Sequence, residues 1–177
     1  MVVEAVRDHA NRLLPTWAIL PTETDELGDL DEFFRQARES GVAAFRAFPD
    51  VNRYLLRYEA VGEIVDFLVA GRIPLILRVP GHVGWENVYD LMMEAPELVL
   101  ILTGMGQWGT DRYFRPLVKR YPYVYVELGG YIVDGGIEAF VETYGAERMV
   151  FGSGIPSAPA SWGPCTLPGS RTRRPCV

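Results

Sequence analysis

The chain has 177 residues, of which 49% are hydrophobic and 23% are charged, so it can bury one sizeable core without a second domain. Its formal net charge of −6 argues against nonspecific nucleic-acid binding. No apolar run reaches the ~18 residues of a membrane span and the N-terminus lacks a signal-peptide pattern, so we expect a cytoplasmic protein that contacts no nucleic acid or membrane.

Two helices are predicted in the first quarter of the chain. Residues 2–14 carry apolar side chains along one side and stop at Pro15, which cannot continue a helix. Asp29 and Glu32 have the spacing of a capping box, and the residues after them repeat apolar side chains three and four positions apart. Gly41 supplies the flexible residue at which this second helix ends.

Short apolar runs alternate with helical segments along the rest of the chain. They predict strands at 17–20, 42–47, 74–78, 98–103, 124–128 and 149–151. Strand starts are separated by 24 to 32 residues, and the segments between them have one apolar stripe each. Apolar strands that alternate with helices form a parallel sheet covered by helices.

Two parallel architectures fit this repeat, an open doubly wound sheet and a (β/α)8 barrel. A dinucleotide-binding sheet carries G-x-G-x-x-G after its first strand, and no predicted strand here is followed by that pattern. The near-constant repeat favours the barrel, although a closed barrel has eight strands and about 250 residues. The predicted fold class is therefore α/β, an incomplete (β/α)8 barrel of six parallel βα units.

The last stretch, residues 157–177, differs from the rest. It has no acidic residue, four prolines, three arginines and no apolar period. Both cysteines, Cys165 and Cys176, lie here and form neither a disulfide framework nor a metal-ligand spacing. Such composition is typical of disorder; a partner-binding tail and a non-native end from a shifted reading frame are the alternatives, and we favour the last. We divide the chain into a partial barrel at 1–156 and this irregular tail.

Five blocks carry a family resemblance. They are GVAAFRAFP at 41–49, GRIPLILRV at 71–79, LVLILTGMGQW at 98–108, YPYVYVELGGY at 121–131 and GAERMVFGSGIP at 145–156. In order and spacing they resemble the amidohydrolase-related family, metal-dependent barrels that include the aminocarboxymuconate-semialdehyde decarboxylase type. The resemblance covers about residues 1–156 and implies that the six strands correspond to the third to eighth strands of such a barrel.

The resemblance also implies a zinc site whose ligands this chain lacks. In the family, a His-x-His pair ends the first strand, histidines end the fifth and sixth, and an aspartate ends the eighth. The later positions correspond here to Arg78, Gly104 and Gly154. Arginine has no lone pair to offer a metal and glycine has no side chain. We therefore expect the barrel fold without a bound metal or other cofactor.

Four polar residues near predicted strand ends are the candidate substrate-binding residues, namely Arg46, Arg78, His82 and Glu127. Polar groups at the carboxyl ends of barrel strands usually face the functional site. The two arginines suit a carboxylate or phosphate, and His82 is a candidate general base with a surface histidine as the alternative reading. For the arginines and Glu127, the alternative is a buried Arg–Glu pair that fills the space left by the metal.

Two functions follow from these residues and the resemblance. The first is an amidohydrolase-like hydrolase or decarboxylase of a small anionic substrate, with arginines in the electrostatic role of the metal. The second is a non-catalytic ligand-binding or interaction protein on a degenerate barrel. Six strands also leave two open sheet edges, which predicts association into a homo-oligomer.

Overall fold

Six parallel strands form a single sheet in the computed structural model, which describes residues 4, 6, 9, 11–106 and 110–152. The strands are β1 (Thr16–Ile19), β2 (Ala44–Ala47), β3 (Leu75–Arg78), β4 (Leu100–Thr103), β5 (Val124–Glu127) and β6 (Met149–Val150). Each strand pairs with the one that precedes it in the chain. The strand order and parallel pairing predicted from the repeat are therefore confirmed.

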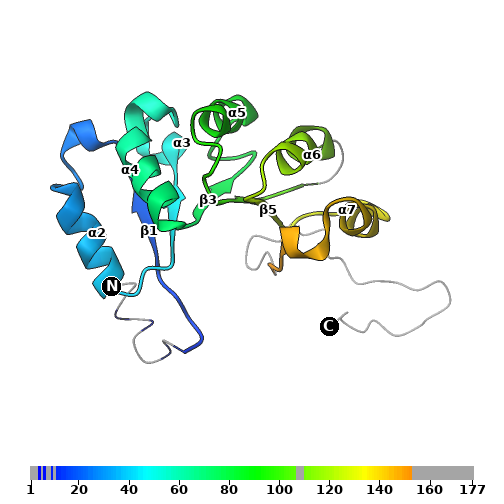
Figure 1. The fold of residues 1–177 in the computed structure, drawn as a ribbon, viewed down its shortest axis with the longest axis horizontal. Coiled ribbons are helices and arrows are strands. Elements are labelled where there is room, and N and C mark those ends of the chain that lie inside the picture. The colour runs from blue at the N-terminus through cyan, green and yellow to red at the C-terminus, as the bar shows by residue number, and fades with distance from the viewer. Residues whose placement is uncertain (1–3, 5, 7–8, 10, 107–109, 153–177) are drawn as a thin grey trace, which may run out of the picture.

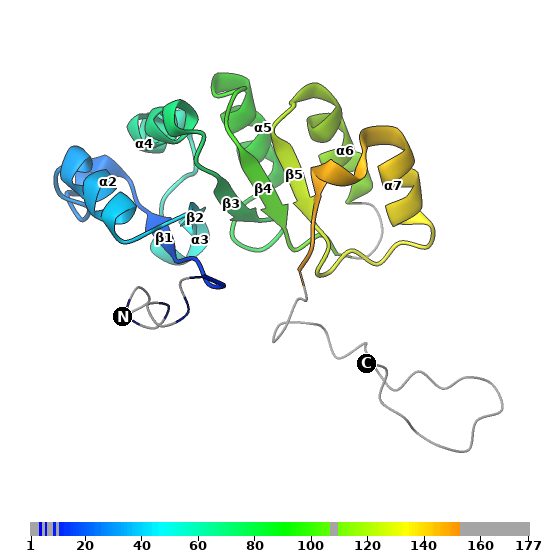
Figure 2. The same ribbon diagram turned by 60° about the horizontal axis from the view of Figure 1, so that its bottom comes forward.

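Helices follow the strands in turn. They are α2 (Leu30–Glu39), α3 (Pro49–Asn52), α4 (Tyr58–Gly71), α5 (Trp85–Glu94), α6 (Asp111–Arg120) and α7 (Gly136–Tyr144), with 3-10 turns η1 (Thr22–Thr24) and η2 (Ala146–Arg148). The longer helices lie in an arc along one face of the sheet, and no described helix covers the opposite, concave face (Figures 1 and 2). Of the helix predicted at 2–14, residues 2, 3, 5, 7, 8 and 10 lie outside the described residues, and residues 11–14 form a turn and irregular chain instead of helix. The short α3 was not predicted.

The helix ends follow the local chemistry that the sequence indicated. The Asp29 side chain accepts a hydrogen bond of 2.9 Å from the Glu32 amide and caps α2. Gly41, just after α2, has φ +70°, and Gly145 ends α7 with φ +90°. At the end of α4 the left-handed position falls on Arg72, with φ +50°, rather than on a glycine.

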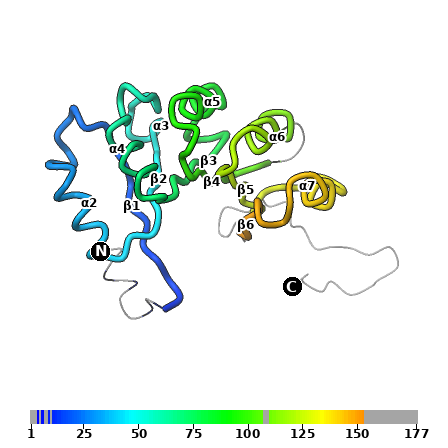
Figure 3. The backbone as a smooth tube through the Cα atoms, viewed as in Figure 1, coloured from blue at the N-terminus to red at the C-terminus, as the bar shows by residue number. Residues whose placement is uncertain are grey.

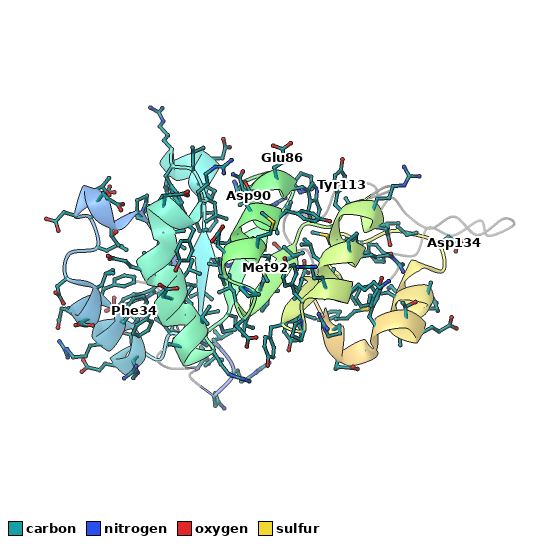
Figure 4. All side chains as sticks on the ribbon, turned by 45° about the horizontal axis from the view of Figure 1, so that its top comes forward. Phe34, Glu86, Asp90, Met92, Tyr113 and Asp134 are labelled. Carbon is teal, nitrogen blue, oxygen red and sulfur yellow. The ribbon has the colours of Figure 1, made fainter. Side chains whose placement is uncertain are left out.

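The two faces of the sheet differ in burial because successive strand residues point to opposite sides. On the helix-covered face, the fully buried strand residues include Ile19, Phe45, Leu75, Leu77, Leu100, Leu102, Val124 and Val126. Phe34 of α2 and Met92 of α5 belong to the same core and are labelled in Figure 4. On the concave face lie the partly exposed or exposed residues Arg46, Ile76, Arg78, Ile101, Thr103, Tyr125 and Glu127, which we call the inner face.

Five of the six described strands are one or two residues shorter than predicted, and the difference at the far edge exposes an aromatic side chain. β6 was expected over 149–151, but it ends at Val150, and the side chain of Phe151 is 85% exposed. β6 pairs only with β5 among the described strands, and Figure 3 shows it at the end of the sheet. Phe151 lies just past the last paired residue, so the predicted burial of this apolar side chain in a strand is wrong.

Candidate functional site

The arginines of β2 and β3 share the inner face. Arg46 lies opposite Ile76 in the β2–β3 register, and Arg78 follows Ile76 by two residues on the same side of the sheet. The spacing of neighbouring strands then places the two arginine Cα atoms about 8 Å apart. Both side chains are exposed. The structure thus brings together, on one face, the two cations that the sequence singled out.

Among the described residues, no acidic side chain forms a salt bridge with Arg46 or Arg78. The salt bridges among the described residues are formed by Arg35, Arg57 and Arg115 instead. No charged side chain of the described residues is fully buried. The alternative of a buried Arg–Glu pair that replaces the metal is therefore wrong, because both arginines are exposed on a sheet face that no described helix covers.

Glu127 turns away from the arginines. Its Oε1 accepts a hydrogen bond of 2.7 Å from the Gly129 amide, and the carboxylate lies where a β-carbon on Gly152 would overlap it. Gly152 follows β6, which neighbours the strand of Glu127, β5, on one side. Arg78 lies on β3, two strands from β5 on its other side. The site therefore has its positive charge on β2 and β3 and its negative charge toward β6.

His82 lies at the same end of β3 as Arg78. Its amide donates to the Arg78 carbonyl at 3.3 Å, and its own carbonyl accepts from the Asp50 amide at 3.4 Å. The imidazole meets Phe48 edge-on, with 5.5 Å between ring centroids, and its Nδ1 is buried without a hydrogen-bond partner. These contacts join the loop after β3 to the segment after β2.

Phe48 was not predicted as part of the site. It follows Arg46 by two residues, just beyond the predicted strand. Because side chains alternate between the two faces of a strand, Phe48 could have been predicted on the same face as Arg46. Among the four candidates, the structure brings Arg46, Arg78 and His82 to one region and leaves Glu127 apart. We call Arg46, Phe48, Arg78 and His82 the carboxyl-end site.

A second cluster of polar side chains joins the loop after β5 to α6. The Tyr131 hydroxyl donates to Asp111 Oδ1 at 2.8 Å, and Arg115 Nε donates to the same oxygen at 2.5 Å. Burial, and then the Asp111 carboxylate, raise the pKa of Tyr131, so this phenol stays protonated as a donor. The cluster ties the loop that follows Glu127 to the start of α6.

The zinc site implied by the family resemblance does not fit the residues present. Arg78 and Gly104 cannot ligate a metal, and Gly154 lies outside the described residues. Within the part of the chain that the structure describes, no group of three or more His, Cys, Asp or Glu side chains is placed to hold a metal ion. Zinc sites in proteins use at least three such ligands.

Comparison with known proteins gives a fold rather than a function. No family model and no curated protein match the chain. Among solved structures it is similar to an uncharacterised TIM-barrel protein from Bordetella bronchiseptica, with a TM-score of 0.70 and 17% identity. The chain is an incomplete TIM barrel. The match covers 89% of this chain and 59% of that protein, so the chain spans well under two thirds of its neighbour's length.

The partial TIM barrel confirms the predicted fold class, and the relation to the amidohydrolase-related family stays a prediction. In TIM barrels the functional site lies at the carboxyl ends of the strands, while the amino ends serve stability. Arg46, Arg78 and Glu127 all lie in the carboxyl-terminal halves of their strands.

None of the described helices is both long and apolar enough to cross a membrane.

Proposed function

We propose that this partial TIM barrel binds a small carboxylate or dicarboxylate at the carboxyl-end site. The observation that supports the proposal is the exposed pair Arg46 and Arg78, on one sheet face and without an acidic partner among the described residues. A guanidinium offers five donors in a planar fork, which matches the two oxygens of a carboxylate. Ile76 and Ile101 lie beside them on the inner face and suit the carbon body of such a ligand.

The family resemblance extends this proposal to hydrolysis or decarboxylation of the bound anion. In either reaction, guanidinium groups stabilise negative charge, and a nearby base or acid moves a proton. His82 is the imidazole at this end of the described structure, and its backbone is held by Arg78 and Asp50. We propose His82 for the proton transfer, to be tested by loss of turnover in His82→Gln with ligand affinity retained.

Binding without catalysis is the second candidate. It is favoured by the donor set, because the described residues offer no three-ligand metal site. Barrels of the same fold host many unrelated functions, so the fold supports both candidates equally. Purified protein that binds dicarboxylates, but neither releases CO2 from them nor hydrolyses amide derivatives, would favour this candidate.

Thermal unfolding in the presence of succinate tests the binding proposal. Wild-type protein should show a succinate-dependent rise in Tm, at constant ionic strength, because a ligand that binds only the folded state stabilises it. Arg78→Ala should lose most of this rise, and Arg46→Ala part of it. Arg112, exposed on α6, supplies the matched control, since Arg112→Ala removes one surface cation away from the site. Equal responses in wild-type protein and Arg78→Ala would disprove the proposed site.

We also propose that the chain self-associates through its sheet edges. β1 and β6 each pair with one described strand, and Phe151 beside β6 is 85% exposed. Unpaired edges and exposed aromatic side chains favour association between chains. Light scattering should therefore give a concentration-dependent mass above that of the monomer, and Phe151→Ser should lower it. A monomer at all concentrations would contradict this proposal.

A further inference from the structure

The side chain of Arg78 lies across the end of the neighbouring strand. β4 ends at Thr103, and the next residue, Gly104, has φ +81°. A β-carbon on Gly104 would lie 3.1 Å from Arg78 Cγ and 3.6 Å from its Nε. Such a contact is tighter than ordinary van der Waals packing, so the stem of Arg78 occupies the space that a side chain at position 104 would need.

A second glycine borders the same side chain. Gly81, in the loop after β3, has φ +144°, and a β-carbon there would lie 3.7 Å from Arg78 Nε and 3.8 Å from Cδ. The side chain of Arg78 therefore lies beside two residues that have no side chain, Gly81 and Gly104. None of the salt bridges among the described residues involves Arg78, whose stem lies beside these two glycines.

We infer that Gly104 is a positioning residue of the carboxyl-end site, which sets where the Arg78 guanidinium meets an anion. The inference rests on the proposed carboxylate binding. It goes beyond the backbone requirement at position 104, because φ +81° alone would explain a glycine without any link to Arg78. Fixing a long, flexible side chain before binding reduces the conformational entropy that is lost when the complex forms. A glycine that does not itself contact the ligand can raise affinity in this way.

The chain offers a control that separates the two roles of the glycine. Gly41 has φ +70°, close to that of Gly104, but a β-carbon there would meet nothing within 4 Å. Gly104→Ala and Gly41→Ala therefore impose the same kind of backbone strain. Only the first also pushes on Arg78. A comparison of the two variants isolates the contact.

Succinate affinity, measured by calorimetry on the full chain, is the decisive readout. We expect Gly104→Ala to weaken binding about tenfold and Gly41→Ala less than about twofold, with similar losses of Tm in both. In an Arg78→Ala background, Gly104→Ala should cause no further loss, because the side chain that it displaces is gone. Should Gly104→Ala not fold, Gly104→Asn and Gly41→Asn replace the pair, since asparagine tolerates positive φ.

The possible outcomes separate the two levels of the proposal. Wild-type protein that does not bind succinate, or Arg78→Ala that binds it normally, overturns the proposed function and this inference with it. Binding that is lost in Arg78→Ala but equal in Gly104→Ala and Gly41→Ala overturns the positioning role alone. A further loss from Gly104→Ala in the Arg78→Ala background also overturns it, because the glycine would then act on something other than Arg78.

Discussion

Two arginines at opposite ends of the sheet have opposite surroundings. At the amino end, half-buried Arg148 donates hydrogen bonds to the carbonyl oxygens of Val118 at 3.2 Å, Tyr121 at 2.6 Å and Val124 at 2.7 Å. At the carboxyl end, Arg78 is exposed, and none of the salt bridges among the described residues includes it. Both side chains carry the same charge, but Arg148 is hydrogen-bonded within the protein and Arg78 is exposed to solvent.

The difference follows from what each end of the sheet presents. Two of the carbonyls that bind Arg148 come from the last turn and C-cap of α6, where helix carbonyls lack partners and the helix dipole is negative. Arg148 therefore closes the junction between α6, β5 and β6. Arg78 is instead the last residue of β3 and lies beside Gly81 and Gly104, and no carboxylate among the described residues forms a salt bridge with it. The amino end thus holds its arginine by hydrogen bonds to carbonyl groups, whereas Arg78 at the carboxyl end makes no salt bridge among the described residues.

The largest expected effect tests the amino end. Arg148→Met should lower the free energy of unfolding by about 3 kcal/mol, because charge-assisted hydrogen bonds to three carbonyls are lost from a half-buried position. It should leave the succinate response unchanged. Arg112→Met, on the exposed side of α6, is the control and should stay within about 0.5 kcal/mol of wild type. Urea unfolding measures both, and equal values for the two variants would contradict the assigned role of Arg148.

Much of the fold could be predicted because its signals are local. The apolar runs of the strands and the helical stripes follow from residue order alone, and Asp29 caps α2 as its spacing to Glu32 indicated. The short α3 was missed because four residues are too few to show a helical period. The 149–151 strand was predicted one residue too long, because an apolar run does not reveal where the neighbouring strand ends.

The candidate site was predicted less fully, for a physical reason. Residue type and position at a strand end were enough to select Arg46, Arg78, His82 and Glu127. The sequence marked Gly104 only as a missing ligand, because the use of its empty space depends on a side chain from another strand. The direction of Glu127 was likewise hidden, since it depends on the Gly129 amide and on the clearance over Gly152.

A smaller loss of unfolding free energy is expected for a change at the carboxyl end of the sheet. Tyr131→Phe should lower the free energy of unfolding by about 1.5 kcal/mol. The reason is that Tyr131 is only 6% exposed and loses its hydrogen bond to Asp111. The control is Tyr113→Phe, whose side chain is 50% exposed, with an expected change within about 0.5 kcal/mol. Equal costs in urea unfolding would mean that the Asp111 cluster does not hold the loop.

The smallest effect depends on pH and concerns Tyr54, whose hydroxyl donates to the Ile19 carbonyl at the carboxyl end of β1 at 3.2 Å. Burial raises the pKa of Tyr54 from 10.0 to about 12. The folded state therefore keeps the proton to higher pH than the unfolded state does. The stability that this gives is complete below pH 10 and is lost as the pH rises through 12.

Tyr54→Phe removes both the hydrogen bond and this titration, so the two proteins should respond differently to alkali. At pH 8 the wild type should be more stable by about 1 kcal/mol. Between pH 8 and 11 its advantage should shrink by about 1.4 kcal/mol, because only the unfolded wild type gains the extra ionisation. The other tyrosines are the same in both proteins and cancel in the difference. Urea unfolding at pH 8, 10 and 11 measures it, and a constant difference would mean that Tyr54 titrates alike in both states.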